Sequence, residues 1–327
     1  MRAQITAVIV CAAVLAGSGC GGLLYPKYTV TVRVVDEVGA PVEGAAAWAS
    51  FSHLRTRNPW DGQDSYAVEG LTDAKGERVL RGRGLMEVRL GAEKDGYYPS
   101  RKNHMFGLNR AEKKDARAVT MELRLRKKIA PTAMYAKCFS DPLPRIGESI
   151  GYDLLAGDWV APHGRGSVSD FIFTSTLDFR GRLDFDARVT MRFTRPGDGL
   201  AVVPTDQVLG ESDLPLPQQA PEEGYNIRDV TWTYVNRPDS MIQKSALSGS
   251  CWYLRVRTEQ DADGRVTKAM YGKITVKIAL GLSMPGPIMG PGPITYYVNP
   301  DGTRNIEFDP KRNLIPNARD YEKPSAP

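Results

Sequence analysis

The sequence predicts an all-β protein, and three observations support that prediction. Apolar or aromatic side chains fall on every second position in residues 28–34 and again in residues 183–194, as in strands with one buried face. Behind residue 20, no stretch of convincing length shows the 3.6-residue period of an amphipathic helix. The 32 glycines and 23 prolines, spread along the chain, supply the many turns that short strands need.

The first predicted domain, residues 24–128, opens on the run YTVTVRVV. Its alternating Tyr and Val side chains predict a strand, and the residues DEVG at 36–39 predict a tight turn that leads into a second strand of the same hairpin. Trp48 lies inside the next strand-like run and is expected in the core. Turn signals between the later short strands favour a β-sandwich.

Three pieces of this region, VRVVDEVGAPVEGA, TDAKGE and EKDGYYP, resemble the carboxypeptidase regulatory-like domain in their order and spacing. That family is a transthyretin-like β-sandwich related in shape to immunoglobulin modules. The resemblance covers about a third of the chain. It implies a binding or packing module, because the catalytic machinery of carboxypeptidases belongs to a separate domain.

No metal or cofactor is predicted. A zinc site needs clustered nitrogen, oxygen or sulfur ligands at tetrahedral spacing. The chain has three histidines, and none has a carboxylate or a second histidine three or four residues further on: His53, His104 and His163. Two oxygen-rich segments, residues 261–264 and 299–303, are interpreted as turns rather than calcium loops, because neither has the further spaced carboxylates of an EF-hand.

Residues 129–315 predict a second antiparallel β domain of long strands, which resembles no named family. The clearest strand covers residues 183–194, with six apolar positions alternating with six polar ones. The pairs Arg180-Gly181 and Asp261–Gly264 predict short hairpin turns. Residues 316–327 are expected to be a polar, fraying tail.

The N-terminus predicts export. Arg2 precedes a largely apolar run at residues 5–16, which is too short for a membrane span of ~20 residues. The residues GSG then lead to Cys20, and residues 1–20 resemble a bacterial lipoprotein signal peptide, whose cysteine is lipidated. The resemblance implies a membrane anchor through the lipid, at the outer membrane or its periplasmic face. The alternative is ordinary signal-peptide cleavage.

Two further cysteines, Cys138 and Cys251, lie in the second domain. In an exported protein two remaining cysteines form a candidate disulfide. The alternative is a pair of separately buried thiols, because a bridge requires the two Cα atoms to lie close together.

Ligand-contact candidates are the aromatic residues Trp60, Tyr97 and Tyr98, since aromatic faces on a sandwich edge can stack against sugar rings or partner side chains. Asp184 and Asp186 share one strand face about 7 Å apart, within the range of glycosidase carboxylates. A solvated charged face is preferred, because arginines share that face. A net charge of +5 over 327 residues predicts no nucleic-acid partner.

The sequence thus favours a non-catalytic, lipid-anchored cell-envelope protein that acts as a binding or structural module for an envelope protein or a glycan. An alternative is a carbohydrate-binding envelope protein, based on the sandwich and its loop aromatics. A second alternative is a hydrolase with an unrecognised site, which the sequence favours least because it has no G-x-S-x-G elbow, Walker loop or C-x-x-C motif. The chain is not predicted to be an enzyme.

Overall fold

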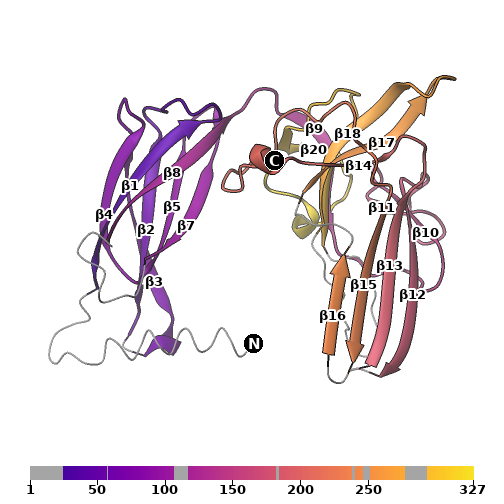
Figure 1. Ribbon diagram of the computed structural model, residues 1–327, viewed down its shortest axis with the longest axis horizontal. Helices are drawn as coiled ribbons and strands as arrows, with labels where there is room; N and C mark the ends of the chain where they lie inside the picture. The colour runs from indigo at the N-terminus through magenta and orange to yellow at the C-terminus, as the bar shows by residue number, and fades with distance from the viewer. Residues whose placement is uncertain are drawn as a thin grey trace. The chain divides into compact units, whose positions relative to one another are not determined.

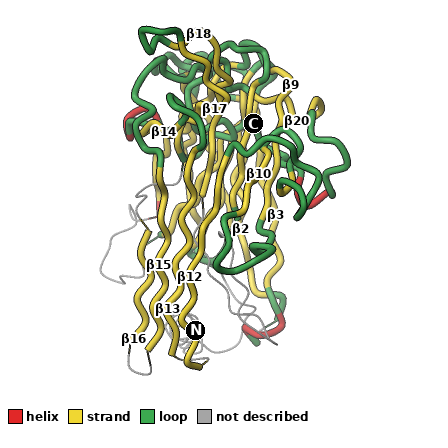
Figure 2. Tube along the Cα trace, turned by 90° about the vertical axis from the view of Figure 1, so that its right-hand side faces the viewer, coloured by secondary structure: helices red, strands yellow, loops and turns green. Residues whose placement is uncertain are grey.

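The computed structural model describes residues 25–56, 58–106, 117–181, 184–237, 240–245, 251–276 and 293–327. Strands make up nearly all of its regular structure, with a few single 3-10 turns, so the all-β prediction is confirmed (Figure 2). No helix within these residues has the length and apolarity needed to cross a bilayer. Cys20 and the predicted signal peptide lie outside the described residues.

The chain divides into two compact units. The first comprises Met1–Lys128 together with the later segment Leu209–Pro215, and the second comprises Ile129–Val208 and Leu216–Pro327. Leu209–Pro215 lies along the last strand of one sheet of the first unit, where Glu211 accepts the backbone N–H of Arg101 at 2.7 Å. This segment therefore covers a strand edge that would otherwise be free to pair.

The first unit is a sandwich of two four-stranded sheets, with strand orders β4-β1-β8-β6 and β3-β2-β5-β7 (Figure 1). Its core takes side chains from both sheets, including alternate residues of β1 and β2. The strands are β1 (Lys27–Asp36), β2 (Ala46–Leu54), β3 (Gln63–Leu71), β4 (Glu77–Arg83), β5 (Glu87–Glu93), β6 (Tyr97–Tyr98), β7 (Ser100–Met105) and β8 (Ala118–Lys127).

The predicted hairpin of β1 and β2 is wrong, because the two strands lie in opposite sheets. β1 pairs antiparallel with β4 and parallel with β8, so both of its edges are occupied. After the turn, Val35 makes one isolated bridge with Pro41. Proline has no N–H to continue a ladder, and the chain crosses to the other sheet instead.

Trp48 also differs from its prediction, because its side chain faces away from the core. Ala47 and Ala49 on either side of it are the buried residues of β2. The half-buried indole lies over Gly91 of β5, where an added Cβ would come within 2.5 Å of the ring. A glycine in the neighbouring strand therefore makes room for the tryptophan on the outer face.

The second unit is a sandwich of two six-stranded sheets, with orders β11-β10-β12-β13-β15-β16 and β14-β17-β18-β19-β9-β20. Its central core lies between them and includes five phenylalanines and all three tryptophans of the unit. The strands are β9 (Thr132–Phe139), β10 (Ile150–Asp153), β11 (Asp158–Trp159), β12 (Phe171–Gly181), β13 (Asp184–Phe193), β14 (Gly199–Val202), β15 (Asp229–Arg237), β16 (Ser240–Ser245), β17 (Trp252–Gln260), β18 (Val266–Val276), β19 (Ile294–Asn299) and β20 (Phe308–Asn313).

The long strand predicted at residues 183–194 is β13, whose alternate residues Phe185, Ala187 and Val189 are buried. The predicted hairpins β12–β13 and β17–β18 are confirmed by antiparallel pairing. The domain is not purely antiparallel, because β20 pairs parallel with β9.

A buried charge cluster joins the two sheets of the second unit. Arg257 sits at a β-bulge in β17 with φ of 53°, in the left-handed region that non-glycine residues seldom adopt. The bulge breaks the alternation of β17 and directs the side chain toward the opposite sheet. There its Nε donates to Asp170 Oδ1 at 2.9 Å and a terminal nitrogen donates to Asp153 Oδ1 at 2.8 Å.

Backbone groups complete the cluster. Asp198, beside β14, accepts the N–H groups of Arg257 and Thr258 at 3.2 and 2.9 Å, which holds the bulge in place. Burial raises the pKa of Asp170 and of Asp198. Burial also opposes ionisation of Asp153, but hydrogen bonds from the backbone N–H groups of residues 156, 167 and 168 and the charge of Arg257 outweigh it, so the pKa of Asp153 is lowered.

Replacing Arg257 by Met is expected to destabilise the protein by about 3–5 kcal/mol, because it leaves buried carboxylates without their countercharge. The measurement is chemical denaturation of the full chain. The matched control is Arg265→Met, which removes an exposed arginine from the turn of the same hairpin and should cost less than about 1 kcal/mol. Equal stabilities of the two variants would contradict the role of the cluster.

Candidate functional site

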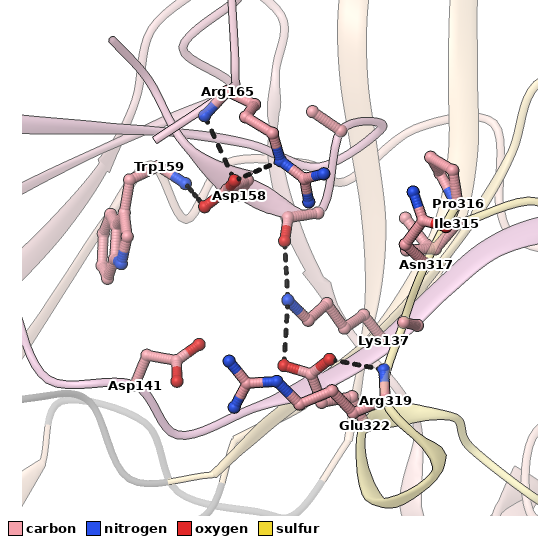
Figure 3. A pocket seen from close by; sticks show the side chains of 13 residues that line it. Lys137, Asp141, Asp158, Trp159, Arg165, Ile315, Pro316, Asn317, Arg319 and Glu322 are labelled. Carbon is pink, nitrogen blue, oxygen red and sulfur yellow. Dashed lines mark hydrogen bonds and ion pairs between the residues drawn. The ribbon is translucent and has the colours of Figure 1, made fainter. Parts of the chain in front are cut away.

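A polar pocket of about 250 Å³ opens at one edge of the second sandwich (Figure 3). Three segments line it: β9, the loop and strand around β11, and residues 315–322. β9 and β11 belong to opposite sheets, so the pocket lies where the two sheets part at their edges. Three cationic and three anionic side chains line it: Lys137, Arg165, Arg319, Asp141, Asp158 and Glu322.

Lys137 is the central residue of the pocket. It is paired in register with Tyr296 on β19, a residue of the inner core, so its side chain enters the space between the sheets. Its Nζ donates to the carbonyl oxygen of Gly157 at 2.7 Å and forms an ion pair with Glu322 Oε1 at 3.2 Å (Figure 3). The Lys137 and Glu322 side chains are only 11% and 8% exposed.

The predicted polar tail at residues 316–327 does not fray. Glu322 Oε2 accepts the backbone N–H of Arg319 at 2.8 Å, and Ala318 is buried. Further along, the hydroxyl of Tyr297 donates to the carbonyl oxygen of Ala326 at 3.0 Å. The segment is therefore docked on the sandwich, and a buried ion pair and backbone hydrogen bonds hold it there.

The other charged side chains of the pocket also lie beside groups of opposite charge. Asp158 accepts from the backbone N–H and the Nε of Arg165, each at 3.1 Å. Burial works against the charged forms of Asp158 and Glu322, but their hydrogen bonds and neighbouring cations outweigh it and lower both pKa values. Asp141 extends toward the Arg319 guanidinium (Figure 3). Because their pKa values are lowered, Asp158 and Glu322 are charged at neutral pH. Charged carboxylates can form ion pairs that hold segments together, but they cannot donate a proton.

The three aromatic residues predicted to contact a ligand have different exposures. Trp60 is 77% exposed, Tyr97 is half-buried, and Tyr98 is 5% exposed. Lysine side chains lie over both tyrosine rings. Of the three, only Trp60 presents an open face for stacking.

The structure also keeps Trp60 apart from the tyrosines. Trp60 lies in the 3-10 turn η1 (Pro59–Asp61) beyond β2. The backbone N–H of Leu54, the last residue of β2, donates to the hydroxyl of Tyr25, two residues before β1 begins. β6, which carries Tyr97, pairs with the last residues of β8 beside the end of β1. The ten residues of β1 span roughly 30 Å, so the aromatics form no common platform.

The predicted Cys138–Cys251 disulfide is corrected by the structure, in which both thiols are free. The hydroxyl of Thr275 donates a hydrogen bond to Cys251 Sγ at 3.6 Å. Thr275 is paired in register with Thr295, and Thr295 is paired with Cys138. The two cysteines thus lie in one row but three strand spacings apart, about 14 Å. A disulfide requires Cα atoms within roughly 7 Å.

Asp184 and Asp186, the pair considered for glycosidase chemistry, are tied to arginines. Asp186 pairs with Arg237 at 2.8 Å, and both carboxylates also contact Arg180. The hydrogen bond from Arg237 lowers the pKa of Asp186, whereas a general acid needs a raised pKa. Within the described residues, no group of three or more His, Cys, Asp or Glu side chains is placed to hold a metal ion.

No protein-family model matches the chain, and no curated protein sequence matches it significantly. Among solved structures it is similar to chlorocatechol 1,2-dioxygenase from Pseudomonas putida, at 13% identity and a TM-score of 0.24, over 32% of this chain and 61% of that one. The chain therefore spans about three fifths of that dioxygenase.

Pilin structures are also similar. The major pilin SpaD from Corynebacterium diphtheriae matches at 11% identity and a TM-score of 0.25, over 86% of this chain and 84% of that one. BcpA, the major pilin subunit of Bacillus cereus, matches at 11% identity and a TM-score of 0.22, over 85% and 97%.

Glu322→Gln is expected to destabilise the protein by about 3 kcal/mol at pH 7, because Lys137 stays buried without its countercharge. The pKa of Glu322 is lowered from its ordinary 4.5, so its contribution is present above that value and is lost as the pH falls through the lowered pKa. The difference from wild type should therefore shrink below about pH 4.5. Denaturation at several pH values measures it.

The matched control is Asp320→Asn in the same segment, since Asp320 pairs with Lys323 on the surface and should contribute less than about 1 kcal/mol. A Glu322→Gln variant as stable as this control at pH 7 would show that the ion pair does not hold the segment.

Cys138 and Cys251 should both react with iodoacetamide when the full chain is denatured without a reducing agent, because neither is bridged. Mass spectrometry of the alkylated peptides measures this. A cross-linked peptide that contains both cysteines would contradict the row geometry.

Proposed function

We propose that this chain is a non-catalytic, exported lipoprotein of a bacterial cell envelope that acts as a structural or binding module. The N-terminal sequence supports this location, with its apolar run and Cys20 after small residues. Cys20 would carry the lipid that anchors the chain to the outer membrane. The first unit would be a member of the carboxypeptidase regulatory-like domains, and its two-sheet sandwich is compatible with that assignment.

The charged pocket supports a structural role, because its side chains bind a segment of the chain itself. Lys137 and Glu322, the two most buried charged groups of the pocket, are bonded to each other and to the backbone, and together they fasten residues 315–322 across the open edge of the sandwich. A catalytic pocket generally keeps an acid or base available at its working pH. Here the charged side chains close the edge of the sandwich, as expected for a stable module of the cell envelope.

The proposed partners are the membrane, through the lipid, and an envelope protein or glycan. The structure leaves polar sheet faces exposed on the second unit, including the outer face of β12, β13 and β15. Such a face presents side chains on alternate residues and can contact a partner without any change in the core.

Metabolic labelling with an alkyne analogue of palmitate should label the wild-type chain expressed in a bacterium that processes lipoproteins, and Cys20→Ala should abolish the label. The same substitution should move the protein from the membrane fraction to the soluble fraction, because a lipid supplies the anchor. Cys138→Ala, which alters a thiol of the second unit, is the matched control and should keep the label. An unlabelled wild-type chain would favour ordinary signal-peptide cleavage.

A further inference from the structure

A groove of about 480 Å³ lies on the outer face of the long-stranded sheet of the second unit, over β12, β13 and β15. These three strands run side by side in both views (Figures 1 and 2). Side chains on alternate positions of each strand point into the groove, while their neighbours fill the core. The groove is therefore built by the sheet itself and is independent of the pocket that Lys137 occupies.

Arg188 lies at the centre of this groove. In register it is paired with Thr176 on β12 and with Thr233 on β15, so a hydroxyl-bearing residue flanks it on each neighbouring strand. The two threonines are roughly 10 Å apart across the sheet. The next row holds Thr190 and Thr231, whose hydroxyls are 2.9 Å apart.

Arg188 differs from the arginines around it in its hydrogen-bond and ion-pair partners. Arg192, four residues further along the same face, is paired with Asp229 at 2.7 Å. Arg237 is paired with Asp186 at 2.8 Å. Arg188 is exposed and forms no hydrogen bond or ion pair with any residue in the described part of the chain. Its five N–H donors are available to an anion from outside.

The other lining groups indicate which anion fits. Threonine hydroxyls both donate and accept hydrogen bonds. The carboxylate of Asp178 forms an ion pair with Arg180, but it is 64% exposed and has further lone pairs that can accept hydrogen bonds. Val235 adds an apolar surface beside Arg188. A ligand that carries many hydroxyl groups and a carboxylate at intervals can bind all of these lining groups. A polyphosphate backbone fits poorly, because Asp178 and Asp186 would repel its closely spaced charges.

We propose that this groove binds an acidic polysaccharide, with a sugar carboxylate on the Arg188 guanidinium and sugar hydroxyls on the flanking threonines and Asp178. A planar guanidinium forms paired hydrogen bonds with a carboxylate, which gives both strength and orientation. The inference deepens the binding role proposed above and rests on it. Glycan binding is measured on the purified chain, whereas the lipid anchor is tested in the cell. Either test can therefore fail without the other.

The test uses the detergent-solubilised full-length chain and polygalacturonate as the probe, with binding measured by calorimetry. Wild type should bind, and the affinity should fall as salt is raised. Arg188→Gln should weaken binding at least about tenfold, since it removes a charge-assisted hydrogen-bonding group. Arg188→Lys should restore only part of the affinity, because lysine lacks the planar fork. Methyl-esterified polygalacturonate, which has lost the carboxylate charge, should bind as weakly as the Gln variant binds the acid form.

The matched control is Arg192→Gln on the same strand face, which should change the affinity less than about twofold because Arg192 is already paired with Asp229. The melting temperature of the Arg188→Gln chain should equal that of wild type, since Arg188 has no partner within the described residues to lose. Failure of wild type to bind, equal losses in the two variants, or equal binding of the methyl ester would overturn the proposal. If poly-glutamate bound through Arg188 more tightly than polygalacturonate, the ligand would be an acidic peptide and the glycan proposal would be wrong.

Discussion

The Arg257 guanidinium, set against buried carboxylates, is the interaction on which the architecture of the second unit depends. Asp153 lies in β10 and Asp170 directly precedes β12 of one sheet, whereas Arg257 lies in β17 and Asp198 directly precedes β14 of the other. The hydrogen bonds between them therefore fix how the sheets lie over each other. Hydrophobic side chains between sheets tolerate small sliding movements, but a buried ion pair with defined donors and acceptors does not. Its desolvation is costly, and the backbone N–H groups that surround the carboxylates offset that cost.

Much of the fold could be predicted from alternation, which shows the face that each residue occupies. β1 and β13 have the predicted buried faces. Alternation does not show which strand pairs with which, and so the β1–β2 hairpin was predicted wrongly. Trp48 was misplaced because an aromatic residue in a strand was assigned to the core, when a glycine on the neighbouring strand gave it a site outside. Arg257 gave no signal, because a bulge reverses the face that alternation assigns to it.

The candidate site was harder to predict for a related reason. Lys137 and Glu322 are far apart in sequence, and each is an ordinary charged residue in its local context. Only the three-dimensional fold brings them together, so a polar tail was expected where a docked segment exists. For the cysteines the error was to predict a contact that the fold does not make. Cys138 and Cys251 do lie on one row of one sheet, but no sequence rule shows the two strands that separate them.

The pairing of β9 has a consequence for the order in which the protein matures. β9 begins the second unit, yet its neighbours in the sheet are β19 and β20, which are synthesised last. All eight strands of the first unit lie within residues 27–127, so that sandwich can assemble its sheets while the chain is still emerging. In the second sandwich, β9 stays unpaired until β19 and β20 have been synthesised, near the end of the chain. Contacts between such distant segments slow folding, so the second sandwich is expected to form more slowly than the first.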